Sequence, residues 1–272
     1  MYLSKHLTDR GARWALDGRY LPAAFTLDLP LELSAAEVDG FLEALPRGTA
    51  ADDPLLPPVE PAQEVWASGV TYEMSREARM AESGEADVYE KVYDAERPEL
   101  FFKALGHRVV GQGGAVRVRA DSRWNVPEPE LVLLLNGRME IVGYTAGDDV
   151  SSRDIEGENP LYLPQAKIYD GSCAIGPGIV LPATPNELRG LRIGLRIQRG
   201  AAVAFEGETS TSRMKRPLEE LAAHLGRELS LPNGAFLMTG TGIVPPDDFS
   251  LTPGDEVEIS VGDLVLINEV AS

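Results

Sequence analysis

Short strand-like segments follow one another from Gly113 to the end of the chain, with little helix between them. Two of them, the runs that begin at Ala115 and Leu191, alternate apolar and polar residues as strands with one buried face do. Others, such as ELVLLLN from Glu130 and DLVLINEV from Asp263, are short and largely apolar and are compatible with strands buried on both faces. Because helices do not alternate with the strands, the pattern argues against a parallel βαβ fold and predicts a β-rich α+β domain.

One clear helix interrupts this region between Pro217 and Gly226. Proline suits the first turn of a helix, and glycine is a typical residue just after the last turn. Leu218, Leu221 and Leu225 lie between them with the spacing of a single helix face. We therefore expect a short helix packed on the sheets by its leucines.

The N-terminal part of the chain differs from the strand-rich region. Ser34 and Glu37 have the spacing of a capping box and predict a short helix with one apolar face. The stretch 51–65, ADDPLLPPVEPAQEV, is rich in proline, which sustains neither a helix nor a central strand. We predict a small N-terminal α+β domain with a proline-rich linker at residues 1–62 and a main domain at residues 63–272. The alternative is a long surface loop within one domain.

The charge balance limits the partners of the protein. The chain has 43 acidic and 25 basic residues, which gives a net charge of −18. Such a field repels phosphate groups, so we expect neither nucleic acid nor an anionic membrane surface as a partner. The chain has a single cysteine, Cys173, no secretory signal, and no apolar run close to the roughly 20 residues that span a bilayer. We therefore expect a soluble, cytoplasmic protein.

Three carboxylates and one lysine form the candidate site. Glu128 and Glu130 are two residues apart, so both side chains point to the same face of a strand. Asp149 lies at the end of the next strand-like run, and Lys167 follows it. Oxygen donors without thiolate or imidazole suit Mg²⁺ or Mn²⁺ rather than zinc. Two glutamates on a solvent-facing strand are the more common reason for such a pair, but the flanking prolines place this pair at a strand start or edge, where a ligand can approach.

Five motifs resemble, in this order, the landmarks of the fumarylacetoacetate hydrolase superfamily: PEPELVLLLN, GYTAGDDVSSRD, AKIYDG, AIGP and TGTGIVP. The resemblance covers the chain from Trp66 onward. A narrower likeness is to the 2-keto-3-deoxy-D-arabinonate dehydratase branch, and GVTYEMSREAR, YEKVYDAERPELFFKA, WNVPEPEL and ENPLYLPQAKIYDGSCAIGP carry it. The resemblance implies a catalytic domain with the mixed β-sandwich or roll of that superfamily, and an enzyme that forms a homodimer or homotetramer.

The resemblance also implies roles for individual residues. Glu128, Glu130 and Asp149 match the metal-binding carboxylates, which hold Mg²⁺, with Mn²⁺ or Ca²⁺ as substitutes. Lys167 matches the active-site lysine. The other matched residues are Glu99, which acts with the lysine in the dehydratase branch, Arg153, which holds the substrate or orients the metal-binding loop, and Thr241, which contacts the acid end of the substrate.

One departure from the family pattern bears on the reaction. Hydrolytic members carry a histidine with a nearby glutamate in the lid segment, whereas TYEMSREAR at the comparable place has no histidine. The three histidines of the chain, His6, His107 and His224, lie elsewhere. Glu156 stands where hydrolases often have glutamine. Without a histidine base, hydrolysis is disfavoured and elimination is favoured.

We therefore expect a metal-dependent hydro-lyase in pentose catabolism. It would convert a 2-keto-3-deoxy-pentonate, such as 2-keto-3-deoxy-D-arabinonate or -xylonate, to 2,5-dioxopentanoate. One alternative is a hydrolase or decarboxylase of a 2,4-diketo acid that uses the same metal site. The other is a metal-binding homologue without catalysis.

The expected chemistry starts with a 2-keto acid bound through its carboxylate and keto oxygens to the cation, which makes the C3 proton more acidic. Lys167 takes this proton, and Glu99 donates one to the departing C4 hydroxyl. The structural alternatives are a salt bridge for Lys167, a surface position for Glu99 and a turn role for Thr241. If Lys167 is neutral, one negative charge at the site is left for another group to offset.

The charged stretch from Thr71 to Glu96 contains an apolar stripe that begins at Val88. The stripe is compatible with a surface helix that packs through it. It is equally compatible with a lid that orders over the site when a ligand binds. The sequence does not choose between them.

Overall fold

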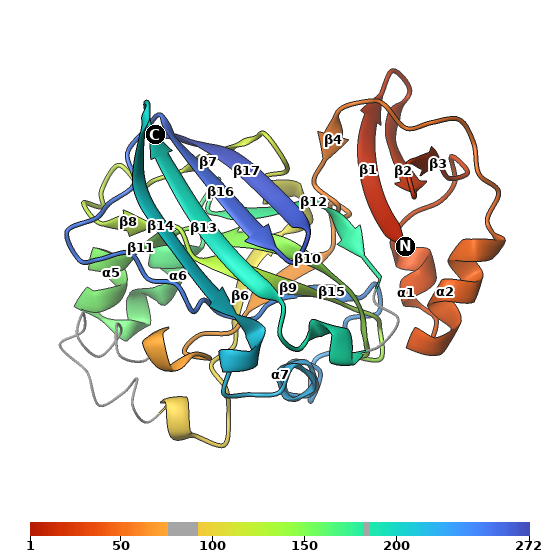
Figure 1. Ribbon diagram of the computed structural model, residues 1–272. Coiled ribbons are helices and arrows are strands. Elements are labelled where there is room, and N and C mark those ends of the chain that lie inside the picture. Colours follow the sequence, from red (N-terminus) through yellow and green to blue (C-terminus); the bar gives the residue numbers. More distant parts are fainter. Residues whose placement is uncertain (76–91, 182–184) are drawn as a thin grey trace.

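The computed structural model of the protein describes residues 1–75, 92–181 and 185–272 (Figure 1). Within these residues, ten strands form a large mixed sheet in the order β3-β2-β1-β12-β10-β9-β15-β5-β6, with β4 paired to β1 outside this path. They are β1 (Tyr2–Thr8), β2 (Gly11–Leu16), β3 (Arg19–Tyr20), β4 (Leu55–Leu56), β5 (Glu64–Ala67), β6 (Phe101–Leu105), β9 (Pro129–Leu135), β10 (Ile141–Asp149), β12 (Cys173–Val180) and β15 (Ala235–Met238).

A second sheet of five described strands has the order β14-β13-β16-β17-β7. Its strands are β7 (Ala115–Arg117), β13 (Arg192–Arg199), β14 (Ala202–Ser210), β16 (Asp255–Val261) and β17 (Leu264–Ala271). A short ribbon pairs β8 (Asn125–Val126) with β11 (Ser151–Ser152). The described α-helices are α1 (Asp28–Leu31), α2 (Ala35–Ala44), α5 (Arg153–Glu158), α6 (Leu163–Lys167) and α7 (Leu218–Leu225). Single 3₁₀ turns lie at Gly106–Arg108, Pro160–Tyr162, Pro185–Leu188 and Thr211–Arg213.

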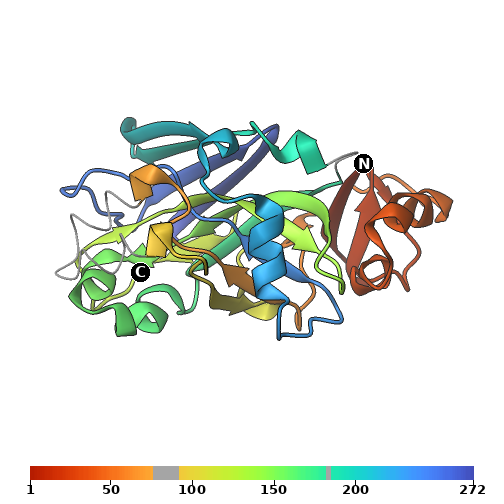
Figure 2. The ribbon, with the colours of Figure 1, turned by 90° about the horizontal axis from the view of Figure 1, so that it is seen from below.

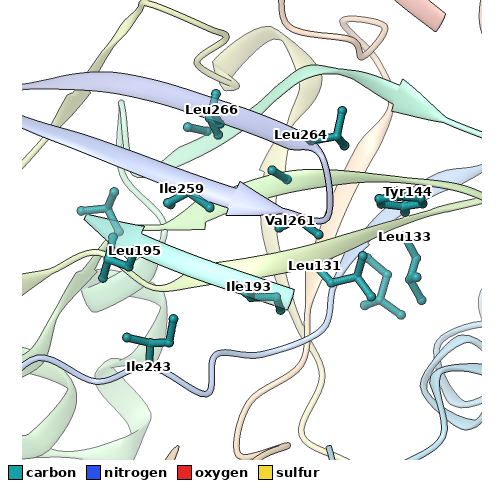
Figure 3. Close-up of a cluster of buried hydrophobic side chains, with 14 of the residues drawn as sticks. Leu131, Leu133, Tyr144, Ile193, Leu195, Ile243, Ile259, Val261, Leu264 and Leu266 are labelled. Atoms are coloured by element: carbon teal, nitrogen blue, oxygen red, sulfur yellow. The ribbon is translucent and has the colours of Figure 1, made fainter. Parts of the chain in front are cut away.

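The two sheets stack as layers, which can be followed in the view from below in Figure 2. Leu131 and Leu133 from β9 meet Ile193 and Leu195 from β13 in the core between the layers (Figure 3). A second buried cluster covers the opposite face of the large sheet and extends into the N-terminal strands and helices. The central strands of the large sheet therefore lie between two apolar layers, which confirms the predicted β-rich α+β class.

The apolar runs of the sequence have two outcomes. Every residue of β9 is buried, with Leu131 and Leu133 in one cluster and Val132 and Leu134 in the other. The prediction of burial on both faces is thus confirmed for this strand. It is wrong for β17, where burial alternates and Val265 is 40% exposed. This strand belongs to the second, five-stranded sheet, which packs on the core through one face only.

Both helices predicted in detail are present. Ser34 and Glu37 form the capping box of α2, with the backbone N–H of Ser34 donating to Oε2 of Glu37 at 3.0 Å. Helix α7 ends before Gly226, and its three leucines are buried. The stripe that begins at Val88 lies largely outside the described residues, so the choice between surface helix and lid stays open. No helix among the described residues is long and apolar enough to cross a membrane.

The N-terminal strands and helices form a lobe at one end of the molecule (Figures 1 and 2). Strand β1 of this lobe pairs with β12, with Tyr2 opposite Val180 and Leu3 opposite Ile179. The large sheet therefore runs from the lobe into the main body. The division after residue 62 stays a proposal about which part folds as a unit.

The site lies where β9 begins and β10 ends. These strands are antiparallel neighbours, with Glu130 opposite Gly147 and Pro129 opposite Asp148. The start of one strand therefore lies beside the end of the other. The predicted position at a strand start is confirmed, but β9 is a central strand of the sheet, not an edge.

Candidate metal centre

The three predicted carboxylates lie together. One oxygen from each of Glu128, Glu130 and Asp149 lies within 4.8 Å of the others, and all three side chains are buried. Their exposed fractions are 5%, 1% and 1%. Burying three carboxylates side by side is unfavourable unless cations balance them. The cluster, with oxygen donors only, therefore fits a hard divalent cation.

The pKa of Glu130 reflects the burial and the mutual repulsion of these carboxylates. Burial raises its pKa well above the usual range, and the negative charges of Asp149 and Glu128 raise it further. Lys167 and the backbone N–H of Gly240, which donates to Oε2 at 2.6 Å, act in the opposite direction. A divalent cation bound to the cluster would favour the ionised carboxylate.

Lys167 is the main positive partner of the cluster. Its Nζ lies 2.9 Å from Oε2 of Glu128, 3.1 Å from Oδ2 of Asp149 and 2.6 Å from Oγ of Ser151. The ion pairs given as the structural alternative are therefore formed. They hold the amine inside the site, at the end of helix α6, so they do not exclude a role as base.

Arg153 reaches the cluster from the start of helix α5. Its Nη1 lies 2.7 Å from Oε2 of Glu156 and 3.5 Å from Oε1 of Glu128. The residue is 2% exposed and is not among the described residues that line the cavity next to the carboxylate cluster. This geometry favours a role of Arg153 in orienting Glu128. The predicted contact between Arg153 and the substrate stays a prediction.

The remaining predicted residues share one cavity with the cluster. Glu99 and Thr241 line it together with Glu128, Glu130, Asp149, Lys167 and Glu156. The backbone carbonyl of Glu99 accepts a hydrogen bond from Oγ of Ser68 at 2.9 Å. The hydroxyl of Thr241 donates to the carbonyl of Ile243 at 3.2 Å, so the turn role is present as well. The cavity therefore brings together the carboxylate cluster, the amine of Lys167, the carboxyl group of Glu99 and the hydroxyl group of Thr241.

Two further charged residues, which were not among the predicted site residues, contact the cluster. Lys103, in the apolar run FFKAL of β6, is 1% exposed and forms an ion pair with Asp149. It also donates to the backbone carbonyl of Lys167. Asp148 is fully buried, its Oδ1 accepts from the backbone N–H of Glu128 at 3.0 Å, and burial raises its pKa to about 8. A charged residue in an otherwise apolar strand is the signal that marks Lys103.

No histidine or cysteine lies among the described residues that line the cavity. His6 lies in the N-terminal lobe, where its ring contacts Oγ of Ser4 at 2.9 Å and the carbonyl of Asp53 at 2.7 Å. His107 and His224 also lie outside the residues that line the cavity. Cys173 is buried, and burial raises the pKa of its thiol to about 12.

The family model of the fumarylacetoacetate (FAA) hydrolase C-terminal region matches residues 64–271. The chain belongs to this family. The matched segment contains every predicted site residue and starts next to the proposed domain boundary. Fold and family thus agree with the expectations from the sequence.

Two relatives are each identical to this chain at half of the aligned positions. A probable 2-keto-3-deoxyxylonate dehydratase of Haloferax volcanii is 50% identical over 200 residues, which cover 74% of this chain and 69% of the relative. A 2-dehydro-3-deoxy-D-arabinonate dehydratase of Saccharolobus solfataricus is 50% identical over 212 residues, which cover 76% and 70%. A solved structure of 2-keto-3-deoxy-D-arabinonate dehydratase with magnesium and 2,5-dioxopentanoate superposes with a TM-score of 0.81, at 38% identity, over 99% of this chain and 98% of its own.

Proposed function

We propose that the protein is a Mg²⁺-dependent dehydratase that converts a 2-keto-3-deoxy-pentonate to 2,5-dioxopentanoate. The observation that carries the proposal is the buried cluster of Glu128, Glu130 and Asp149, which shares one cavity with Lys167 and Glu99. A hydrolase of this family would need a group to activate water, and no histidine lies among the described residues that line the cavity. The dehydratase names of the two relatives support the same reaction.

The three carboxylates would hold the metal ion. When bound, Mg²⁺ supplies a Lewis acid that polarises the keto group and favours the enolate. Manganese and calcium ions, which also prefer oxygen donors, are candidate substitutes. A cation at the cluster would also balance the negative charges of Glu128 and Asp149, which now form ion pairs with Lys167. The amine would then no longer be needed as their counter-charge.

Lys167 would take a proton from C3 of the substrate. Glu99 would protonate the departing C4 hydroxyl, so that one water molecule leaves and a C3–C4 double bond forms. A proton then moves from C5 to C3, and the resulting enol becomes the C5 aldehyde of 2,5-dioxopentanoate. Thr241 would hold the carboxylate end of the substrate, and Arg153 would keep Glu128 in place. Each positioned acid or base contributes about 10²–10⁴-fold to such a rate.

The stereochemistry of the substrate reduces to one centre. Removal of the C2 and C3 centres of D-arabinonate or D-xylonate leaves only C4, and both acids then give the same 2-keto-3-deoxy compound. The informative comparison is therefore between the two configurations at C4.

We also propose that the enzyme works in the cytoplasm as a homodimer or homotetramer. Light scattering on the purified protein measures the oligomeric state.

A substrate panel tests the function. The purified protein is incubated with Mg²⁺ and 2-keto-3-deoxy-D-arabinonate, its C4 enantiomer, or an acylpyruvate, and the products are followed by NMR. The proposal predicts 2,5-dioxopentanoate from one C4 configuration and no cleavage of the acylpyruvate. Cleavage of the acylpyruvate without aldehyde from either sugar acid would support the diketo-acid hydrolase instead. No turnover of any of the three would leave the non-catalytic alternative.

A further inference from the structure

Ser151 is a buried side chain beside Lys167 that has no part in the function proposed above. It lies in the short strand β11 and is 0% exposed. Its Oγ lies 2.6 Å from Nζ of Lys167 and 2.9 Å from the backbone carbonyl oxygen of Asp149. One hydroxyl group therefore connects the proposed base to the backbone of a proposed metal ligand.

The extended backbone explains why this serine, and not its neighbour, reaches the site. Side chains at alternate positions of an extended segment point to the same side. Asp149 and Ser151 accordingly both contact Lys167. Ser152, at the position between, donates to Oδ1 of Asn125 at 2.8 Å instead. Two adjacent buried serines thus face opposite ways.

The groups involved fix the direction of the hydrogen bonds. A hydroxyl has one hydrogen, and that of Ser151 is donated to the carbonyl of Asp149. Its oxygen is then an acceptor for Lys167, which carries three donors when protonated. Two further acceptors of the amine are Oε2 of Glu128 and Oδ2 of Asp149. Among these three acceptors, Ser151 alone is not a proposed metal ligand.

We propose that Ser151 is a positioning residue that holds the amine of Lys167 when Glu128 and Asp149 bind a cation. Carboxylate lone pairs that bind a cation are withdrawn from the lysine, and the hydroxyl group remains to anchor it. An anchor matters because proton transfer requires Nζ near C3 of the substrate, and a displacement of about 1 Å can lower a rate about 100-fold. The inference rests on the proposed function in one respect, the assignment of Lys167 as base.

The test measures proton abstraction alone, with pyruvate as the probe. Pyruvate is a 2-keto acid with C3 protons but no C4 hydroxyl, so its deuterium uptake in D₂O with Mg²⁺ reports on the base without dehydration. The variants are Ser151→Ala, Ser151→Thr, which keeps the hydroxyl group, and the matched control Ser152→Ala. Isothermal titration calorimetry measures their Mn²⁺ affinity, and thermal unfolding monitors the fold. Ser151→Cys replaces the alanine variant if that variant does not fold.

We expect Ser151→Ala to lower the exchange rate about 10- to 100-fold while Mn²⁺ affinity and the KM for pyruvate stay unchanged. Ser151→Thr should recover most of the rate, and Ser152→Ala should match the wild-type protein. Wild-type exchange in Ser151→Ala would overturn the proposal. Equal losses in Ser151→Ala and Ser152→Ala would overturn it too, because they would indicate general loosening of the segment.

The same experiment separates this inference from the proposed function. Exchange by the wild-type protein without aldehyde formation from the sugar acid would refute the dehydratase function, and the comparison of the serine variants would still decide the role of Ser151. If the wild-type protein with Mg²⁺ does not exchange the protons of pyruvate, Lys167 is not a base, and the positioning role is refuted with it.

Discussion

The ammonium group of Lys103 donates a hydrogen bond to the backbone carbonyl of Lys167, the last residue of helix α6. The same group pairs with Oδ1 of Asp149, whereas Lys167 contacts Oδ2 of that carboxylate. The buried side chain of Lys103 therefore links the carboxylate cluster to the chain segment that carries the proposed base. It is also a candidate for the group that offsets the negative charge left when Lys167 is neutral.

Replacing Lys103 by methionine tests how strongly this link stabilises the fold. We expect Lys103→Met to lower the free energy of unfolding by about 3–5 kcal/mol, because the buried carboxylate of Asp149 loses one of its two cationic partners. Urea denaturation of the metal-free protein measures the change. The control Arg192→Met removes an exposed pair with Glu208, whose charged atoms are 3.8 Å apart, and should cost less than about 1 kcal/mol. Equal losses in the two variants would contradict a special role for Lys103.

Replacing Glu99 by glutamine tests its proposed role as the acid. Because glutamine cannot protonate the departing hydroxyl group, Glu99→Gln should lower kcat for the sugar acid about 10²–10⁴-fold. Deuterium uptake by pyruvate should stay at the wild-type rate, since that reaction needs the base alone. A parallel loss in both assays would show that Glu99 supports the whole site and is not the acid.

A glycine beside Glu99 offers a second approach. A Cβ at Gly69 would lie 2.2 Å from Oε2 of Glu99, so Gly69→Ala should displace the carboxyl group and lower the dehydration rate. The fold should change little, because the clash is with the end of a flexible side chain. The matched variant Gly40→Ala has nothing within 4 Å of the added carbon and lies exposed in helix α2. It should keep wild-type kcat and gain about 0.5–1 kcal/mol of stability. Wild-type dehydration in Gly69→Ala would argue against a fixed position for Glu99.

The pKa of Asp148 predicts how the stability of the metal-free protein depends on pH. Burial raises this pKa to about 8 from the ordinary value of 3.8. Between these values the folded state binds a proton that the unfolded state has lost. Stability should therefore fall as pH rises through this window, by up to about 1.4 kcal/mol per pH unit for this group. Glu130, whose pKa is also raised, acts in the same direction.

Asp148→Asn removes one of these titrations. Urea denaturation in the presence of EDTA, repeated across the window, should give a flatter dependence of stability on pH for this variant than for the wild-type protein. The comparison uses slopes, since the substitution also changes the hydrogen bond from the backbone of Glu128 to Oδ1. An unchanged slope would contradict the raised pKa of Asp148.

The sequence predicted the parts of the site that depend on neighbouring strands. Glu130 and Asp149 meet because β9 and β10 follow each other in the chain and pair antiparallel. Period-two reasoning placed Glu128 and Glu130 on one face, and the structure brings their oxygens together. Local rules of this kind operate within one or two strands, so a single sequence is enough to apply them.

Contacts that join distant segments were not predictable in the same way. Lys103 lies on β6, at one end of the large sheet, and reaches Asp149 on β10 only through the packing of the folded chain. In the sequence, Ser151 and Ser152 are chemically identical neighbours, and only their folded orientation separates them. The burial of β17 on one face likewise depends on which sheet the strand joins. These features follow from tertiary packing, which overrides local pattern.

The role of Lys167 in the dehydration is tested by comparing the wild-type protein with Lys167→Ala in one NMR assay. Both are loaded with Mg²⁺, after calorimetry has established that each binds the ion, and both receive 2-keto-3-deoxy-D-arabinonate. We predict 2,5-dioxopentanoate from the wild-type protein and a loss of about 10²–10⁴-fold in rate for the variant. Full activity in Lys167→Ala, or no aldehyde from the wild-type protein, would show that Lys167 and the carboxylate cluster do not together perform the dehydration.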